Sequence, residues 1–303
     1  MTQTDLVNRS SSNAVALETT LLVHGVPADA APGLAAKLSE AVRAQGAEPA
    51  LIGIVNGTPT VGMTDDELAV LLGAGEVPKV NTANLGIAIH RKTHGATTVS
   101  TTIELAALAG VRVFATGGIG GVHRDSAVTW DISSDLHALA RWPVAVVTSG
   151  VKSILNVSGT REMLETLGVP VVGFRCDAFP AFYRRASEAG VDARFDDAAD
   201  LAAFVAAELA RNGRGVVIAN PIPEPHEIGA ADLDAWTDQA HAEATQQGIG
   251  GRAVTPFVLS RLHEISGGRT LGANVELALD NARLAGRVAA GMPREAAQGA
   301  SPG

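Results

Sequence analysis

The chain has 303 residues, of which 46% are apolar and 18% are charged, so it can form a large buried core. Its net charge of −9 argues against a broad nucleic-acid-binding surface, which would be basic. The single cysteine excludes an internal disulfide and a cysteine-rich zinc site, and no apolar run is long enough to span a membrane. We therefore expect a soluble, cytoplasmic protein that binds neither nucleic acid nor membrane.

The order of the expected elements indicates the fold class. Strand-like apolar runs alternate with helical patterns, and no period of about 20–50 residues repeats. This pattern favours an α/β fold, a three-layer α/β/α arrangement with a largely parallel central sheet. We expect a flexible N-terminal tail at 1–13, a single α/β domain at 14–290 and a flexible C-terminal tail at 291–303.

The first expected element is an apolar run at 15–25 that is interrupted by one carboxylate, Glu18. A carboxylate inside a strand costs desolvation energy unless it is paired or used, although a glutamate at a strand edge can also face solvent. A helix at 30–46, a strand at 50–55, a return strand at 58–62 and a capping box at 64–67 follow.

The next stretch is rich in polar residues. Lys79 opens a loop-like segment at 79–86, and a short helix is expected at 87–92. Hydroxyl side chains then crowd residues 97–102, directly before an apolar helix at 103–108. These hydroxyls either cap the helix or hold a phosphate at its N-terminus, and both readings remain open.

The chain is organised around residues 111–152. A strand at 111–116 runs into four glycines within residues 117–121, and a second strand at 143–149 is followed by Lys152. Glycines let the backbone approach a ligand closely, and parallel sheets bind ligands beyond the carboxyl ends of their strands. The alternative is two ordinary turns with a surface lysine.

The remaining elements follow the same alternation. Strands are expected at 169–173 and 215–220, and helices at 160–165, 196–212, 230–247, 255–266 and 271–290. The densest aromatic patch, at 179–183, either lines a pocket or packs in the core.

These strand ends carry groups suited to covalent chemistry on a carbonyl. One of the two lysines, Lys79 and Lys152, could form a Schiff base while the second cation binds an anion, with Glu18 nearby. Asp131 and Asp135 are four residues apart, so on a helix they would share a face and could hold a hard divalent ion.

Several strings of the sequence resemble the pseudouridine-5′-phosphate glycosidases, an indigoidine-synthase-A-like family. The most specific is Phe114-Ala-Thr-Gly-Gly-Ile-Gly-Gly-Val-His-Arg124. The others lie at 16–19, 24–27, 95–99, 131–135, 152–155, 219–224 and 255–257. The resemblance extends over about 15–290, which is nearly the whole chain.

The resemblance implies a homotrimeric, manganese-dependent α/β/α enzyme that joins or separates ribose 5-phosphate and an aglycone through a carbon–carbon bond. It implies that Lys152 forms an imine with C1 of the sugar and that Glu18 is the acid and base. It further implies that the sugar phosphate and metal-linked water are bound by Lys79, Val99, Ser133, Ser134 and Asp135. Asp131 would be the carboxylate beside the metal, and the aglycone pocket would be lined by Thr116, His123 and Asn274.

The chain departs from the family pattern at 81–86, Asn56, Trp130 and Asn156. Uracil is the aglycone that the family name implies, and an alnumycin-type C-glycosynthase relative, which acts on an aromatic polyketide in antibiotic biosynthesis, is an equal alternative. A protein that binds a sugar phosphate without catalysis is the third hypothesis. The imine reading predicts an adduct on Lys152 that borohydride traps, and the binding reading predicts none.

Overall fold

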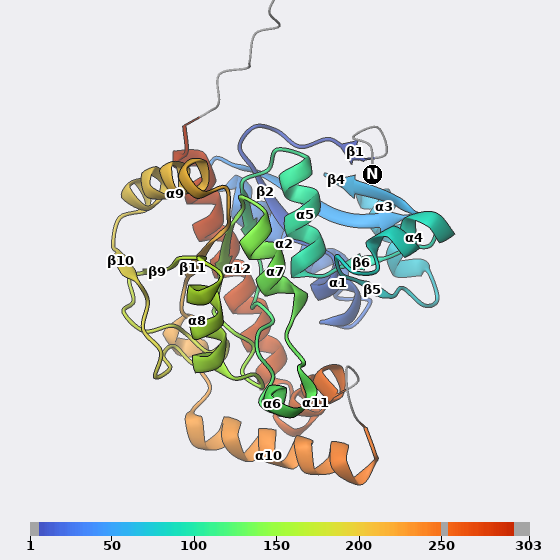
Figure 1. The fold of residues 1–303 in the computed structure, drawn as a ribbon. Coiled ribbons are helices and arrows are strands. Elements are labelled where there is room, and N and C mark those ends of the chain that lie inside the picture. Colours follow the sequence, from blue (N-terminus) through green and yellow to red (C-terminus); the bar gives the residue numbers. More distant parts are fainter. Residues whose placement is uncertain (1–5, 250–253, 294–303) are drawn as a thin grey trace, which may run out of the picture.

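The computed structural model describes residues 6–249 and 254–293. The described part of the chain contains a nine-stranded sheet in the order β1-β4-β3-β2-β7-β8-β11-β9-β10, which Figure 1 shows with helices on both faces. Its strands are β1 (Val7–Asn8), β2 (Ala14–Glu18), β3 (Glu48–Val55), β4 (Thr58–Val61), β7 (Val113–Ala115), β8 (Ala145–Thr148), β9 (Val171–Phe174), β10 (Ala193–Phe195) and β11 (Val216–Ala219). Neighbouring strands pair in parallel except β3 with β4, so the expected parallel α/β architecture is confirmed.

Two helical layers cover the sheet. The helices are α1 (Thr20–His24), α2 (Ala31–Arg43), α3 (Asp65–Gly73), α4 (Leu85–Arg91), α5 (Val99–Leu108), α6 (Ser126–Thr129), α7 (Ser134–Arg141), α8 (Val157–Thr166), α9 (Ala198–Asn212), α10 (Ala230–Gln246), α11 (Val254–Ile265) and α12 (Arg269–Gly291). A 3₁₀ turn, η2 (Glu224–His226), follows β11, and a separate two-stranded sheet pairs β5 (Lys79–Val80) with β6 (Ala96–Thr97).

Alternation along the strands explains the three layers. Val15 and Leu17 of β2 pack in one buried cluster with α2, α9 and α12, whereas Ala14 and Ala16 pack in a second cluster with α5, α7 and α8. Successive strand residues point to opposite faces, so an uninterrupted apolar strand supplies both clusters at once. Figure 1 shows α5, α7 and α8 on one side of the sheet and α12 on the other.

The apolar run at 15–25 is two elements instead of one. β2 ends at Glu18, Thr19 adopts helical backbone angles (φ −91°, ψ −15°), and α1 follows. The buried Thr19 hydroxyl donates to the carbonyl of Ile52 in β3 at 3.0 Å, which anchors the turn. A short apolar run does not by itself distinguish a buried strand from a helix, so the sequence pattern missed this break.

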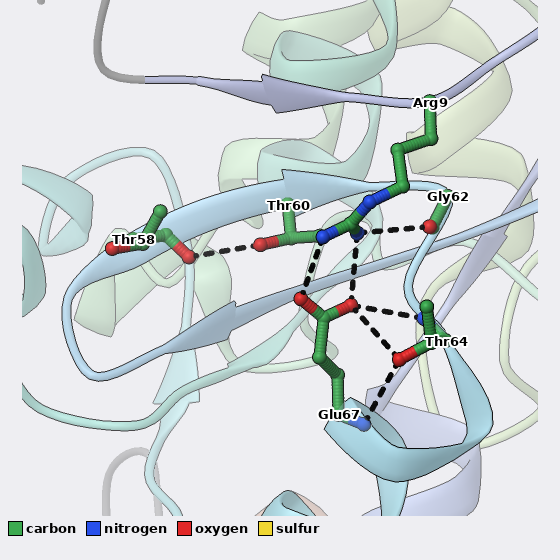
Figure 2. Close-up of polar contacts among 6 residues, drawn as sticks. All are labelled: Arg9, Thr58, Thr60, Gly62, Thr64 and Glu67. Carbon is green, nitrogen blue, oxygen red and sulfur yellow. Dashed lines mark hydrogen bonds and ion pairs between the residues drawn. The ribbon is translucent and has the colours of Figure 1, made fainter.

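The segment expected as an N-terminal tail, 1–13, is partly ordered structure. β1 pairs with β4 at the edge of the sheet, and residues 1–5 lie outside the described residues. Figure 2 shows the anchor: both terminal nitrogens of Arg9 bond to the Glu67 carboxylate, at 2.9 and 3.0 Å. Glu67 also completes the predicted capping box with Thr64 at the start of α3. Backbone pairing with β4 and the ion pair with Glu67 thus give residues 7–9 partners that the sequence pattern does not indicate.

The C-terminal helix ends close to the expected boundary. α12 extends to Gly291, one residue beyond the predicted end, and 294–303 of the expected C-terminal tail lie outside the described residues. Among the described helices, none is both long and apolar enough to cross a membrane.

Candidate active site

A cavity of about 310 Å³ lies at the carboxyl edge of the sheet. It is lined by Glu18 at the end of β2, Thr116 to Gly118 after β7 and Lys152 after β8. Lys79 of β5 and Asn274 of α12 complete the polar lining that the sequence predicts. The structure therefore brings five of the expected site residues to one cavity: Glu18, Lys79, Thr116, Lys152 and Asn274.

Glu18 faces this cavity and is partly buried. Its Oε1 accepts a hydrogen bond from the Thr116 hydroxyl at 2.5 Å. Burial raises the pKa of the Glu18 carboxyl, and the nearby Lys152 charge and the Thr116 hydrogen bond only partly offset this effect. A carboxyl group with a raised pKa exchanges protons more readily near neutral pH, which suits an acid and base.

The second lysine has a perturbed environment as well. Desolvation by the surrounding protein atoms lowers the pKa of the Lys79 ammonium, although the residue as a whole is exposed. The charge of Lys152 lowers the Lys79 pKa further, and Glu18 opposes this. Two cations and one carboxylate thus interact electrostatically around one cavity, and such clusters of perturbed groups mark functional sites.

The glycine segment is held against the start of α7 by Asp135. The buried Asp135 carboxylate accepts hydrogen bonds from the backbone N–H groups of Ser100, at 2.9 Å, and Gly120, at 2.8 Å. A Cβ on Gly120 would collide with Ser133 and Asp135, so this close approach requires glycine. Asp135 therefore fixes the glycine segment and the N-termini of α5 and α7 relative to one another.

Hydroxyl groups gather where α5 and α7 begin. The Ser100 hydroxyl lies 3.0 Å from that of Ser134 and 3.1 Å from that of Thr98, and Ser133 caps α7 by accepting from the Asp135 N–H. Thr98 precedes α5 without a side-chain cap bond, so the simple capping interpretation of this threonine is wrong. Ser133 and Ser134 belong to this hydroxyl cluster, and Val99 and Asp135 lie beside it at the starts of α5 and α7; none of the four is in the cavity lining.

His123 and Asp131 form a separate pair outside the cavity lining. His123 Nδ1 lies 3.7 Å from Asp131 Oδ2, and the His123 N–H donates to the Asp131 carbonyl at 3.1 Å. The prediction that Asp131 and Asp135 share a helical face was wrong, because α7 begins only at Ser134. Asp131 belongs to the loop that precedes the Ser133 cap, while both Asp135 oxygens bond to backbone N–H groups.

The carboxyl ends of three strands are tied together by Asn281 of α12. Its fully buried side-chain amide donates to the Thr116 carbonyl at 2.8 Å and to the Ser149 hydroxyl at 3.1 Å. Its Oδ1 accepts from the Asn220 side chain, after β11, at 3.0 Å. Asn281 thus fixes the start of the glycine segment from the side opposite Asp135.

We expect Asn281→Ala to lower the free energy of unfolding by about 1–3 kcal/mol, because it leaves buried polar groups without partners. Urea unfolding should show a lower midpoint at an unchanged slope. The exposed Gln239→Ala in α10 is the control, with an expected change within about 0.5 kcal/mol. Equal midpoints for Asn281→Ala and the wild type would contradict this structural role.

Several lining residues were not predicted as site residues. His24 ends α1 and lines the cavity, and Phe182 and Tyr183 of the aromatic patch form part of its wall. Leu259, Ser260 and His263 of α11 complete the outer side. The sequence carries no signal for these α11 residues, because their helical pattern matches that of any helix packed on a core.

The departures from the family pattern have local structural roles. Asn156 caps α8 by accepting from the Gly159 N–H at 2.8 Å, and Asn84 accepts from the Asn81 N–H at 2.8 Å. Asn56 (φ 50°) and Trp130 (φ 57°) occupy left-handed turn positions. None of these residues lines the cavity, so these departures leave its described walls unchanged.

The fold and cavity define an α/β protein with a small-molecule site at the carboxyl edge of its sheet. The chain belongs to the indigoidine synthase A-like family, because the model for "Indigoidine synthase A like protein" matches residues 6–291.

Curated relatives support this membership over nearly the full length. A pseudouridine-5′-phosphate glycosidase of a Nocardioides species is 46% identical over 283 residues, which is 93% of this chain and 92% of that protein. One from Geobacillus kaustophilus is 47% identical over 277 residues, which is 91% of this chain and 92% of that protein.

Solved structures agree with the fold. The prealnumycin C-glycosynthase AlnA in complex with ribulose 5-phosphate is similar with a TM-score of 0.85 and 38% identity, over 92% of this chain and 91% of AlnA. An indigoidine synthase A-like protein from Thermotoga maritima has a TM-score of 0.85 and 36% identity, over 94% of this chain and 95% of that one.

Proposed function

We propose that this protein makes or breaks a carbon–carbon bond between C1 of ribose 5-phosphate and an aglycone, with pseudouridine 5′-phosphate as the first candidate substrate. The observation that carries the proposal is that Lys152, Lys79 and Glu18 line one cavity. A carbon-linked aglycone has no glycosidic oxygen to protonate, so the paired-carboxylate scheme of ordinary glycosidases does not apply. An imine supplies the electron sink instead.

In the direction of synthesis, the Lys152 amine condenses with the C1 aldehyde of ring-opened ribose 5-phosphate and releases water. The protonated imine then accepts the nucleophilic carbon of the aglycone. Glu18 takes the proton that this carbon loses, and ring closure by the sugar oxygen expels the lysine amine. Breaking the bond follows the reverse order, in which Glu18 donates the proton. The raised pKa of Glu18 supports both roles.

The sugar phosphate is assigned to Lys79 and the hydroxyl cluster. Val99 begins α5, so its N–H has no partner within the helix, and Ser133 and Ser134 stand where α7 begins. Helix N-termini favour anions such as phosphate, and Lys79 adds a positive charge at the cavity. Asp135 holds these elements in place.

Manganese remains a proposal. The described residues contain no group of three His, Cys, Asp or Glu side chains placed to hold a metal. The described residues therefore fit only an ion that takes most of its ligands from water and substrate phosphate, as small hard cations do. We assign Asp131 as the protein carboxylate beside such an ion, which would neutralise phosphate charge. Loss of manganese dependence in Asp131→Asn would support this assignment, and an unaltered dependence would contradict it.

The identities to known relatives favour uracil over a polyketide aglycone. Identity is 46% and 47% to the two glycosidases and 38% to AlnA. An aromatic polyketide is the alternative aglycone.

The homotrimer that the family implies is a separate prediction. Light scattering of the purified protein measures it directly.

We expect the purified protein with manganese to release uracil from pseudouridine 5′-phosphate, as measured by chromatography. Incubation with ribose 5-phosphate and borohydride should add the reduced sugar phosphate to Lys152, as measured by peptide mass spectrometry. Trapping without uracil release would favour a different aglycone. Binding of ribose 5-phosphate without any trapped adduct would leave the non-catalytic binding protein and reject the proposed reaction.

A further inference from the structure

The outer wall of the cavity contains a histidine that the proposed reaction does not use. His263 of α11 lines the cavity next to Leu259 and Ser260 of the same helix. Its Nδ1 lies 2.7 Å from the hydroxyl of Thr270, in the first turn of α12. The imidazole is therefore held by a neighbouring helix and is not a freely rotating surface group.

The position of Thr270 relates His263 to the assigned aglycone residues. Thr270 and Asn274 are four residues apart in α12, so they share one face of that helix, about one turn apart. The Asn274 Oδ1 lies 3.2 Å from where a Cβ on Gly117 would stand, and Gly117 follows Thr116. His263, Asn274 and Thr116 thus follow one another along one wall of the cavity.

The hydrogen bonds around Thr270 determine which ring atom meets a ligand. The Ser266 hydroxyl is 3.2 Å from the His263 carbonyl and 3.0 Å from the Thr270 hydroxyl; with its proton on that carbonyl, Ser266 accepts from Thr270. We therefore assign the Nδ1–H of His263 as the donor and Thr270 as the acceptor of their 2.7 Å contact, a contact that fits either tautomer. Burial lowers the pKa of the His263 imidazole and favours its neutral form. In this tautomer Nε2 carries a lone pair, and it has no protein partner within the described residues.

We propose that His263 is a specificity-determining residue, whose Nε2 accepts a hydrogen bond from an N–H or O–H group on the edge of the aglycone. The inference rests on the proposed function. The nearby walls fit such a ligand: Leu259 and Phe182 line the cavity, and the fully buried Tyr183 packs behind Phe182, edge to face, at 4.7 Å between ring centroids. A flat, uncharged ring with a polar edge matches this lining, whereas Lys79 and Lys152 are assigned to the sugar phosphate and Glu18 to proton transfer.

The test uses steady-state kinetics in the direction of synthesis, from ribose 5-phosphate and uracil. His263→Phe keeps a ring and removes the acceptor, so we expect the KM for uracil to rise about tenfold, while the KM for ribose 5-phosphate stays within about twofold. His263→Gln restores a polar atom and should recover much of the loss. His137→Gln, on the exposed side of α7, is the matched control and should leave both constants unchanged.

N-methylated uracils add a second readout. The wild type should discriminate against a uracil whose edge donor is methylated, and His263→Phe should lose most of that discrimination. Borohydride trapping of ribose 5-phosphate on Lys152 separates the possible failures. If every variant is trapped but the KM for uracil and the discrimination do not change, the role of His263 is wrong and the proposed reaction stands. If the wild type forms no adduct, the proposed reaction fails and this inference fails with it.

Discussion

Lys152→Ala is expected to abolish the borohydride-trapped adduct and to lower kcat for pseudouridine 5′-phosphate at least about 10³-fold. The variant keeps the cavity and the second cation but lacks the amine that forms the imine. Peptide mass spectrometry after reduction measures the adduct, and uracil release measures turnover. Lys152→Arg is the matched variant, because a guanidinium keeps the positive charge beside Glu18 but does not form an imine under these conditions. It should be as inactive as Lys152→Ala.

Lys79→Gln distinguishes the two lysines of the cavity. If Lys79 binds the phosphate, its removal should raise the KM for ribose 5-phosphate and leave the adduct on Lys152. An adduct on Lys79 in the wild type would exchange the roles of the two lysines. Substantial turnover by Lys152→Arg would exclude Lys152 as the nucleophile. Both lysines line the same cavity, so only this pair of variants separates nucleophile from anion binder.

Glu18→Gln is expected to keep the trapped adduct and to lower kcat about 10²–10⁴-fold, the usual contribution of one acid–base group. Glutamine preserves the shape and can still accept from Thr116, so loss of activity would report proton transfer instead of packing. The remaining activity should lack the limb of the wild-type pH profile that belongs to Glu18. A variant with wild-type kcat would exclude Glu18 as the acid and base.

The raised pKa of Glu18 also predicts how the free energy of unfolding of the wild type, compared with that of Glu18→Gln, changes with pH. The folded state binds this proton more tightly than the unfolded state, whose pKa is near 4.5. Wild-type stability therefore falls as pH rises from about 4.5 through the folded-state pKa, while Glu18→Gln carries no such term. Urea unfolding at a series of pH values should show the free energy of unfolding of Glu18→Gln rising relative to that of the wild type over this interval. Above the folded-state pKa, the difference between the two should become constant. A constant difference would mean that the carboxyl is not desolvated.

The alternation of apolar strands and amphipathic helices was sufficient to predict the layers. β7, β8, β9 and β11 lie inside the expected runs or within one residue of them, because buried parallel strands require uninterrupted apolar residues. Residues placed at strand ends were also predicted to meet: Glu18, Thr116 and Lys152 all line the cavity. Parallel strands bring their carboxyl ends to one edge, so sequence position alone carries this information.

Contacts between helices were not predictable in the same way. The i, i+4 spacing of Asp131 and Asp135 suggested a shared face, but the Ser133 cap starts α7 between them. The α11 wall and the Asn281 side chain depend on how distant helices pack against the sheet, and no local pattern encodes that packing. The edge strand β1 was missed because its short, polar sequence resembles a tail.

The reaction groups and the aglycone wall belong to different parts of the molecule. Glu18 ends β2 and Lys152 lies in the segment after β8; both strands pair with β7, so β2 and β8 lie about two strand spacings apart, roughly 10 Å between backbones. His263 instead belongs to α11, which Figure 1 shows away from the sheet. Substitutions in α11 can therefore alter which ring is accepted without changing the span that a pentose must bridge. Such a division would let one scaffold diversify its products while its bond-forming chemistry is conserved.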